Sequence, residues 1–225
     1  MESGLLKSNE ELSMKIRTSF MVMAIWAVVA SVVPAGDSDQ DGFQSLFNGK
    51  DLSQWVVMGD ERGWSVKDGV IHSDGSQGGE WLRSVRQYED FIFRVDWKVS
   101  KDGNSGVFIR STAEGKPWKT GYEVQISNQP RDDSHCTGSL YAYAAVNPRP
   151  DESADEWHTF EITCRGDLIT VVSDGVECVR YDQSSSDRTK DKPKRAYIGL
   201  QDSHSPEGHY IEYRNIMIKP LASSN

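Results

Sequence analysis

The chain has 225 residues, 34 acidic and 25 basic side chains, a formal net charge of -9 and three cysteines. An acidic balance without a basic stripe argues against partners such as nucleic acid or an anionic membrane surface. Three scattered cysteines are too few for a disulfide scaffold or a zinc site. Residues 36–225 are enough for one domain with a sizeable core.

The N-terminus is typical of a secretory signal peptide. Lys15 and Arg17 form a basic segment, and residues 20–33 form an apolar run. Val33-Pro34-Ala35 provides the small residues that precede a cleavage site. We therefore expect a signal peptide at 1–35, cleavage after Ala35, and a secreted or periplasmic protein with no stable membrane span.

The remaining boundaries follow from composition. A short acidic linker at 36–42 is expected to lead into one domain at 43–221, with a tail at 222–225. Met1 and Met14 are both candidate starts. An uncleaved membrane anchor is the alternative to a cleaved signal, although the apolar run is short for a span.

Alternation of apolar and polar residues predicts β-strands along the whole domain. It is clearest at 91–99, where every second residue is apolar. No window of helical length after the signal carries a 3.6-residue apolar stripe. The pattern therefore predicts an all-β sandwich or barrel. The other strands are expected at 55–58, 64–66, 70–72, 81–84, 103–110, 121–126, 139–144, 157–165, 168–173, 176–181, 196–202 and 210–219.

Four single positions refine this pattern. The alternation at 210–219 slips near Asn215, which predicts a β-bulge there. His158 lies on the inward phase of its strand and is expected in the core. Two-residue turns in the meander put Cys164 opposite Ile169 and Cys178 opposite Val171, so these cysteines are out of register for a disulfide.

Two predicted strands suggest a site. In 103–110 and 121–126, the polar residues Arg110, Glu123 and Gln125 lie on the faces opposite the apolar sets. Adjacent Glu and Gln in mid-strand are unusual, because neither gains from the pleat itself. This open sheet face is our candidate site. The alternative is a cross-strand ion pair between Glu123 and Arg110 on a solvated face.

Seven segments, in one order, resemble the 3-keto-disaccharide hydrolase family of secreted bacterial proteins. They are 43–55 (FQSLFNGKDLSQW), 103–110 (GNSGVFIR), 121–126 (GYEVQI), 137–141 (TGSLY), 156–162 (EWHTFEI), 198–202 (IGLQD) and 213–216 (YRNI). The resemblance implies a concanavalin- or laminin-G-like jelly-roll β-sandwich of two antiparallel sheets. It also implies action on carbohydrates oxidised to a ketone at C3. One departure is that Ser203 separates Asp202 from His204, whereas the family tends to have His directly after Gln-Asp.

The implied chemistry sets the requirements for a site. A ketone at C3 makes the C2 proton acidic, so a base that removes it gives an enediolate that expels the C1 substituent. Water then adds to the enone, and the net change is glycoside cleavage. Such a site needs a base that works near neutral pH, a donor for the developing oxyanion, and walls that position the ring.

Candidate residues can be assigned to these roles. The expected catalytic residues are Glu123 as base and His204 as second acid or base. The expected substrate-binding residues are Asn104, Arg110, Gln125, Tyr141 and Gln201. A divalent metal ion is a possible cofactor by resemblance, with Glu123, Asp202 and His204 as ligands, and no nucleotide cofactor is expected. Trp81 and Trp118 are candidate stacking platforms for a pyranose.

Two other functions fit the same sequence. One is a carbohydrate-binding module without chemistry, because jelly rolls host lectins as readily as enzymes. The other is a structural or adhesion domain whose sheet face contacts a protein. A deep carboxylate with a raised pKa favours the enzyme, a shallow aromatic face favours the binding module, and a flat apolar patch favours the adhesion domain.

Overall fold

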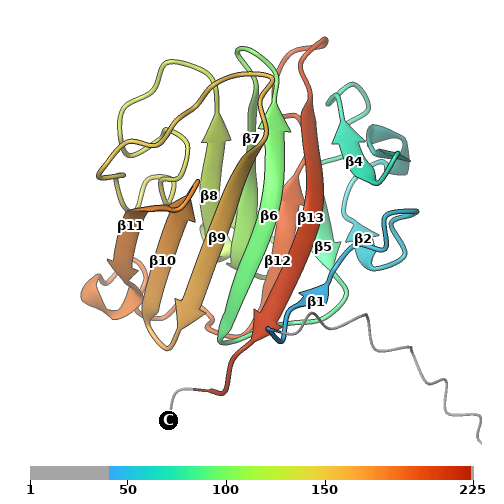
Figure 1. Cartoon of the computed structure of the whole chain (residues 1–225). Helices are drawn as coiled ribbons and strands as arrows, with labels where there is room; N and C mark the ends of the chain where they lie inside the picture. The colour runs from blue at the N-terminus through green and yellow to red at the C-terminus, as the bar shows by residue number, and fades with distance from the viewer. Residues whose placement is uncertain (1–40, 224–225) are drawn as a thin grey trace, which may run out of the picture. The chain divides into compact units, whose positions relative to one another are not determined.

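The computed structural model describes residues 41–223. The predicted signal peptide and all but the last two residues of the predicted linker lie outside the described residues. The described chain folds into two antiparallel β-sheets that pack face to face (Figure 1). This confirms the predicted all-β sandwich. In this part of the chain, no helix is long and apolar enough to cross a membrane.

The larger sheet has eight strands in the order β11-β10-β9-β6-β13-β4-β3, and β1 pairs with β13. The bounds are β1 Gln44–Ser45, β3 Ser65–Lys67, β4 Val70–Ser73, β6 Phe91–Val99, β9 His158–Arg165, β10 Leu168–Ser173, β11 Val176–Asp182 and β13 Ile211–Pro220.

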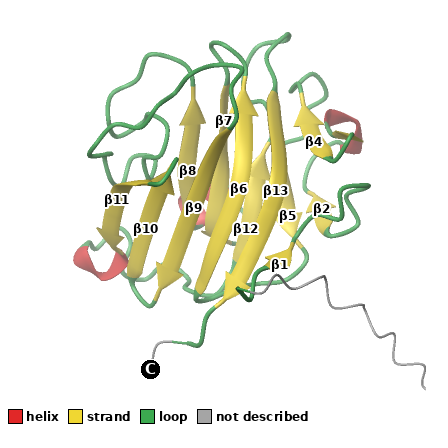
Figure 2. Cartoon of the chain, in the orientation of Figure 1, coloured by secondary structure: helices red, strands yellow, loops and turns green. Residues whose placement is uncertain are grey.

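The smaller sheet has five strands in the order β2-β5-β12-β7-β8. Their bounds are β2 Trp55–Val57, β5 Trp81–Ser84, β7 Asn104–Ser111, β8 Tyr122–Ser127 and β12 Tyr197–Gln201. Helical turns are confined to η1 Glu61–Gly63, α1 Pro117–Thr120 and η2 Gln183–Ser185 in the described residues (Figure 2).

The core lies between the sheets and is built on β6, which pairs with β9 and β13. The alternate apolar residues of β6 are at most 1% exposed, as the alternation predicts. Each buried side chain of this size stabilises the fold by about 1.5–3 kcal/mol. His158 is 4% exposed and stacks on Trp97 at 4.6 Å between ring centroids, which confirms its predicted place in the core.

The sequence predicts only some of the local irregularities in the strands. The pairing of β13 with β6 shifts between Arg214 and Met217, and Asn215 has a φ of +50°, so the predicted bulge is confirmed. The strand predicted at 139–144 is wrong, because these residues form turns with isolated bridges. Ala142 adopts a φ of +60°, which interrupts an extended strand.

The positions of the cysteines differ in part from the prediction. Cys164 lies opposite Ile169 as predicted, but a register shift places Val179, instead of Cys178, opposite Val171. All three cysteines are buried free thiols.

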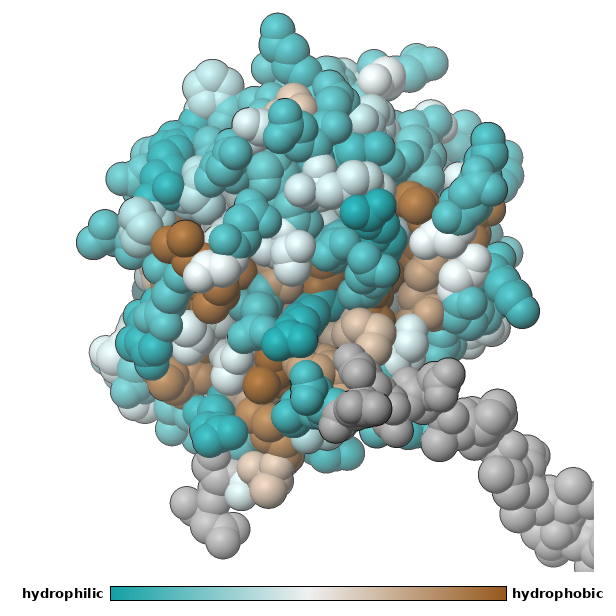
Figure 3. All heavy atoms as spheres, in the orientation of Figure 1, coloured by the Kyte–Doolittle hydropathy of each residue, from teal (hydrophilic) through white to brown (hydrophobic). Residues whose placement is uncertain are grey.

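On the face seen in Figure 3, hydrophilic side chains predominate and apolar areas are scattered among them.

Candidate active site

A cavity of about 870 Å³ lies on the smaller sheet. Side chains of β5, β12, β7 and β8, which are neighbours in that sheet, contribute to its lining. Residues of α1 at 117–118 and loop residues at 75–80, 115–116, 131, 141 and 202–206 complete it. The cavity therefore gathers segments that are far apart in the sequence, above a rigid sheet.

Two glycines leave room for the larger groups of the sheet surface. A Cβ atom on Gly106 of β7 would lie 2.7 Å from the Glu123 Oε1 atom. A Cβ atom on Gly199 of β12 would lie 2.3 Å from the Trp81 ring. Because neither glycine has a side chain, Glu123 and Trp81 can lie across the neighbouring strands. Trp81 also packs edge-to-face on Phe108, at 5.6 Å between centroids.

Glu123 is the buried acid of the cavity. It stands on β8 opposite Phe108 and is 6% exposed. Burial raises the pKa of Glu123 to about 8, and the charge of Arg131 offsets this only in part. A carboxyl with such a pKa is half ionised slightly above neutral pH, where a general base works best. Glu123, the base candidate of the sequence, therefore lies in the cavity as a buried carboxyl with a raised pKa.

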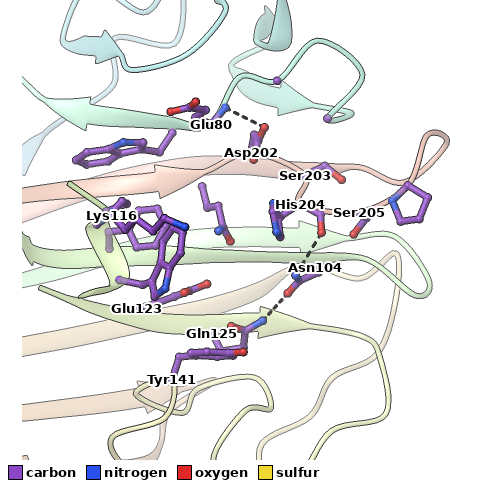
Figure 4. A pocket seen from close by; sticks show the side chains of 18 of the residues that line it. Glu80, Asn104, Lys116, Glu123, Gln125, Tyr141, Asp202, Ser203, His204 and Ser205 are labelled. Carbon is purple, nitrogen blue, oxygen red and sulfur yellow. Dashed lines mark hydrogen bonds between the residues drawn. The ribbon is translucent and has the colours of Figure 1, made fainter. Parts of the chain in front are cut away.

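Hydrogen bonds join the next part of the cavity into a chain (Figure 4). Gln125 donates from Nε2 to Asn104 Oδ1 at 2.5 Å, and Asn104 donates from Nδ2 to the His204 carbonyl at 3.3 Å. The His204 amide donates in turn to the Asn104 carbonyl at 2.8 Å. The structure thus brings together three predicted site residues. The His204 side chain is exposed at the cavity.

Asp202 and Glu80 form a reciprocal pair at the end of β12. The Glu80 amide donates to Asp202 Oδ2 at 2.9 Å, and the Asp202 amide donates to the Glu80 carbonyl at 3.0 Å. Asp202 is 6% exposed, and burial raises the pKa of its carboxyl despite the hydrogen bond from Glu80. Glu80 directly precedes β5, Asp202 directly follows β12, and both line the same cavity as Glu123 of β8 (Figure 4).

Gln201 has an unsatisfied polar atom at the cavity. Its side chain is 8% exposed, and Oε1 is buried without a hydrogen-bond partner among the described residues. Its backbone carbonyl accepts hydrogen bonds from Ser105 Oγ at 2.9 Å and Tyr213 OH at 3.2 Å, which fixes the residue in place. A buried acceptor without a partner costs stability, and a ligand donor would recover it.

Aromatic residues form part of the wall. Tyr141 is tied to β8 by its amide, which donates to the Glu123 carbonyl at 2.9 Å, and its ring meets His135 edge-on at 4.7 Å. Trp118 lies on α1 and is half-buried, with Lys116 Nζ 5.2 Å from the ring centroid. Both aromatic residues line the cavity, as does Trp81.

The predicted position of Arg110 is wrong. Arg110 is fully buried away from the cavity, where it donates to Gln183 Oε1 at 3.0 Å and to the Gly166 carbonyl at 2.8 Å, and lies 3.8 Å from Asp90. Its φ is +54°, and the pairing of β7 with β12 shifts register nearby. This irregularity breaks the alternation that placed Arg110 beside Glu123, so the alternative ion pair between them does not form.

The residues expected to bind a metal do not form one ligand set. In the part of the chain that the structure describes, no group of three or more His, Cys, Asp or Glu side chains is arranged to hold a metal ion. Glu123, Asp202 and His204 line one cavity without forming such a group, and Asp202 already accepts a hydrogen bond from Glu80. These three residues therefore do not fit the predicted ion.

The structure adds residues that the sequence did not suggest. Arg131 and Glu80 both line the cavity from loops. Neither loop has a periodic pattern, so nothing in the sequence shows where these side chains point. The one available signal was composition, because polar loops between strands often carry function.

Comparison with known proteins decides the family. Residues 42–219 match the model of the family described as the 3-keto-alpha-glucoside-1,2-lyase-like domain. The chain belongs to this family. A 3-keto-disaccharide hydrolase of Bacteroides thetaiotaomicron is 29% identical over an alignment of 153 residues, and the match covers 55% of this chain and 53% of the relative. The chain thus spans about half the length of this curated relative.

Solved structures show the same fold. A presumed glycosyl hydrolase from Parabacteroides distasonis is 24% identical, with a TM-score of 0.69 over 81% of this chain and 95% of the other. A carbohydrate-binding module of Bacillus subtilis is 13% identical, with a TM-score of 0.50 over 74% of this chain and 95% of the module. These likenesses concern the fold alone and confirm a jelly-roll β-sandwich for this member of the 3-keto-alpha-glucoside-1,2-lyase-like family.

Proposed function

We propose that this domain cleaves 3-keto-glycosides or 3-keto-disaccharides by removing the C2 proton and expelling the C1 substituent. One observation carries the proposal: Glu123 is buried in a cavity of about 870 Å³, with a pKa of about 8. Family membership and the name of the Bacteroides relative support the substrate class. The residues supply each step as follows.

The Glu123 carboxylate takes the C2 proton. The electrons of the C2–H bond pass into an enediolate, with the negative charge on O3. When the ketone re-forms, a C1–C2 double bond forms and the bond from C1 to the leaving oxygen breaks. Water then adds to C1, and protonated Glu123 returns a proton to C2. The sum is hydrolysis of the glycoside, with Glu123 restored.

The leaving oxygen needs a proton. Two groups of the cavity have suitable chemistry, the exposed imidazole of His204 and the buried carboxyl of Asp202. Burial raises the pKa of Asp202, which favours the protonated, donating form. After expulsion, the group that gave the proton can accept one from the attacking water.

Other residues suit the binding of a sugar ring. The Gln201 Oε1 atom has no hydrogen-bond partner within residues 41–223 and can accept from a sugar hydroxyl. Asn104, Gln125 and Tyr141 line the same cavity and offer further polar groups. The Trp118 ring provides a wall against which the apolar face of a pyranose can stack.

A carbohydrate-binding module is the second candidate. The fold likeness to the Bacillus module and the aromatic wall favour it. A module that only binds sugar needs no proton acceptor, so a buried carboxyl with a pKa of about 8 favours the enzyme. For an adhesion domain, a flat apolar patch is expected, yet Val85 and Val176 are the large hydrophobic side chains exposed within residues 41–223.

The test uses the full chain and two variants. We expect the wild-type protein to release the aglycone from 3-keto-glucosides and to leave the parent glucosides intact. Glu123→Gln removes the base and should lower turnover at least about 100-fold, with sugar binding retained. Glu161→Gln is the matched control, because Glu161 pairs with Arg94 on the other sheet.

The outcomes separate the two functions. Binding of keto sugars without cleavage by the wild-type protein would support the binding module. Full turnover by Glu123→Gln would exclude Glu123 as the base. Equal losses in Glu123→Gln and Glu161→Gln would point to a general loss of stability.

A further inference from the structure

The loop after β8 places a guanidinium group at the cavity. Arg131 is half-buried and lines the cavity. Its Nε atom donates to Ser127 Oγ at 2.9 Å, and its Nη2 atom donates to Gln129 Oε1 at 3.0 Å. Both partners are neutral, so the side chain is fixed in position and its charge is not cancelled.

The acids next to Arg131 pair with other groups. Asp132 lies 2.9 Å from His135 Nδ1. Asp133 and Glu152 both pair with Arg149, at 3.2 and 2.9 Å. Arg149 Nη1 also donates to the Arg131 carbonyl at 2.9 Å, which anchors the loop from the outside. Within residues 41–223, Arg131 is thus a cavity cation without a carboxylate partner.

Arg131 also acts on Glu123. Its positive charge lowers the pKa of the Glu123 carboxyl, against the larger effect of burial. The guanidinium therefore lies close enough to influence a charge at the base. A second cation of the lining, Lys116, is exposed and packs over the ring of Trp118. Arg131 is the better placed of the two to meet a charge that develops next to Glu123.

We propose that Arg131 is a catalytic residue that binds O3 of the keto sugar and stabilises the enediolate. The inference rests on the proposed function. As Glu123 takes the C2 proton, the electron pair moves toward C3 and O3 becomes negative. An N–H of Arg131 donates a hydrogen bond to O3, and no covalent bond forms to the arginine. Because Ser127 and Gln129 hold the guanidinium in advance, little reorganisation is needed when the charge appears.

Arg110, which the sequence placed among the substrate-binding residues, does not reach the cavity. An enolate chemistry needs a donor at the oxyanion, and Arg110 is buried elsewhere on Gln183 and Gly166. Arg131 approaches from a loop on the edge strand β8, the strand that carries Glu123. Base and oxyanion donor therefore reach the cavity from one local segment of chain.

The experiment compares three substitutions in the full chain. Arg131→Met should lower kcat on a 3-keto-glucoside about 100-fold, the typical loss for an oxyanion donor, with little change in KM. Arg131→Lys should retain part of the activity. Arg131→Ala should regain activity when guanidinium chloride is added well below denaturing concentration. Binding of the parent glucoside, which has an O3 hydroxyl and forms no enediolate, should weaken much less than kcat falls in all three.

Arg149→Met is the structural control. It removes the anchor of the same loop and leaves Arg131 in the chain. A similar loss in Arg149→Met, together with no guanidinium rescue of Arg131→Ala, would show that Arg131 only holds the loop and would overturn the inference. Wild-type kcat in Arg131→Met would overturn it too, while the proposed function stands. Absence of cleavage by the wild-type protein would instead refute the proposed function, and the role of Arg131 with it.

Discussion

At the scale of single residues, Glu123 combines a structural cost with a chemical use. It lies on a strand over Gly106, where any larger residue would meet its carboxyl. The alternation of β8 predicted its face, and the family resemblance suggested its role. The sequence did not predict its burial, because the cavity around Glu123 is also lined by loop residues, such as Tyr141 and Asp202, whose positions depend on the whole fold.

The burial of Glu123 should make the free energy of unfolding depend on pH. Glu123 has a pKa of about 8 when folded, against 4.5 for an ordinary Glu, so the folded state binds the extra proton between these values. Stability therefore falls as pH rises from 4.5 to 8. Glu123→Gln should remove this loss and raise the free energy of unfolding at pH 8.5 by about 1–3 kcal/mol relative to wild type, with little difference near pH 4.5. Urea unfolding at both pH values measures it, and an equal gain at both would contradict the burial of a titrating carboxyl.

At the scale of elements, the short helix α1 depends on a distant lysine. Lys192 Nζ donates to the carbonyls of Lys119 and Gly121 at 2.5 Å each, at the end of α1. It also lies 4.9 Å from the ring centroid of Tyr122. A helix of one turn is not stable alone, so these contacts position Trp118 at the cavity.

Lys192→Met should therefore loosen α1. Hydrogen bonds from a charged donor are worth about 1.5–3 kcal/mol each, and part of this should appear as lost stability. We expect KM for the keto sugar to rise several-fold while kcat changes little, because the role proposed for Trp118 is to stack on the sugar ring and not to act on the reacting atoms. Acrylamide quenching, compared with and without Trp118→Phe, should show a more accessible Trp118. Unchanged quenching and KM would exclude Lys192 as a positioning residue.

The same scale shows what alternation predicts and what it misses. The inward face of β6 and the bulge at Asn215 follow from the pattern of apolar residues. Arg110 and Ala142 break it, since both adopt positive φ values that non-glycine residues rarely take. One such residue changes the direction of the following chain. For this reason Arg110 was assigned to the cavity and 139–144 to a strand.

At the scale of the whole molecule, a rigid sandwich carries a site made mainly from loops. The cavity joins residues from Gly75 to Pro206, so its composition depends on long-range packing and not on any local motif. Gln201 and Tyr141 were predicted as site residues from the resemblance to the family. The periodicity of the sequence did not indicate them. Arg131 and Glu80 were found only when the fold brought them to the cavity.

The most direct measurement is the fate of the C2 proton. The full chain is incubated with a 3-keto-glucoside in D₂O, and the released 3-keto sugar is examined by NMR for deuterium at C2, with Glu123→Gln as the control for spontaneous exchange. Our account predicts deuterium at C2 that is formed at the rate of cleavage by the wild-type protein and lost in Glu123→Gln. Cleavage without deuterium at C2, together with equal cleavage rates for substrates carrying hydrogen or deuterium at C2, would contradict it, because elimination must break the bond to the C2 hydrogen even when Glu123 returns the same proton.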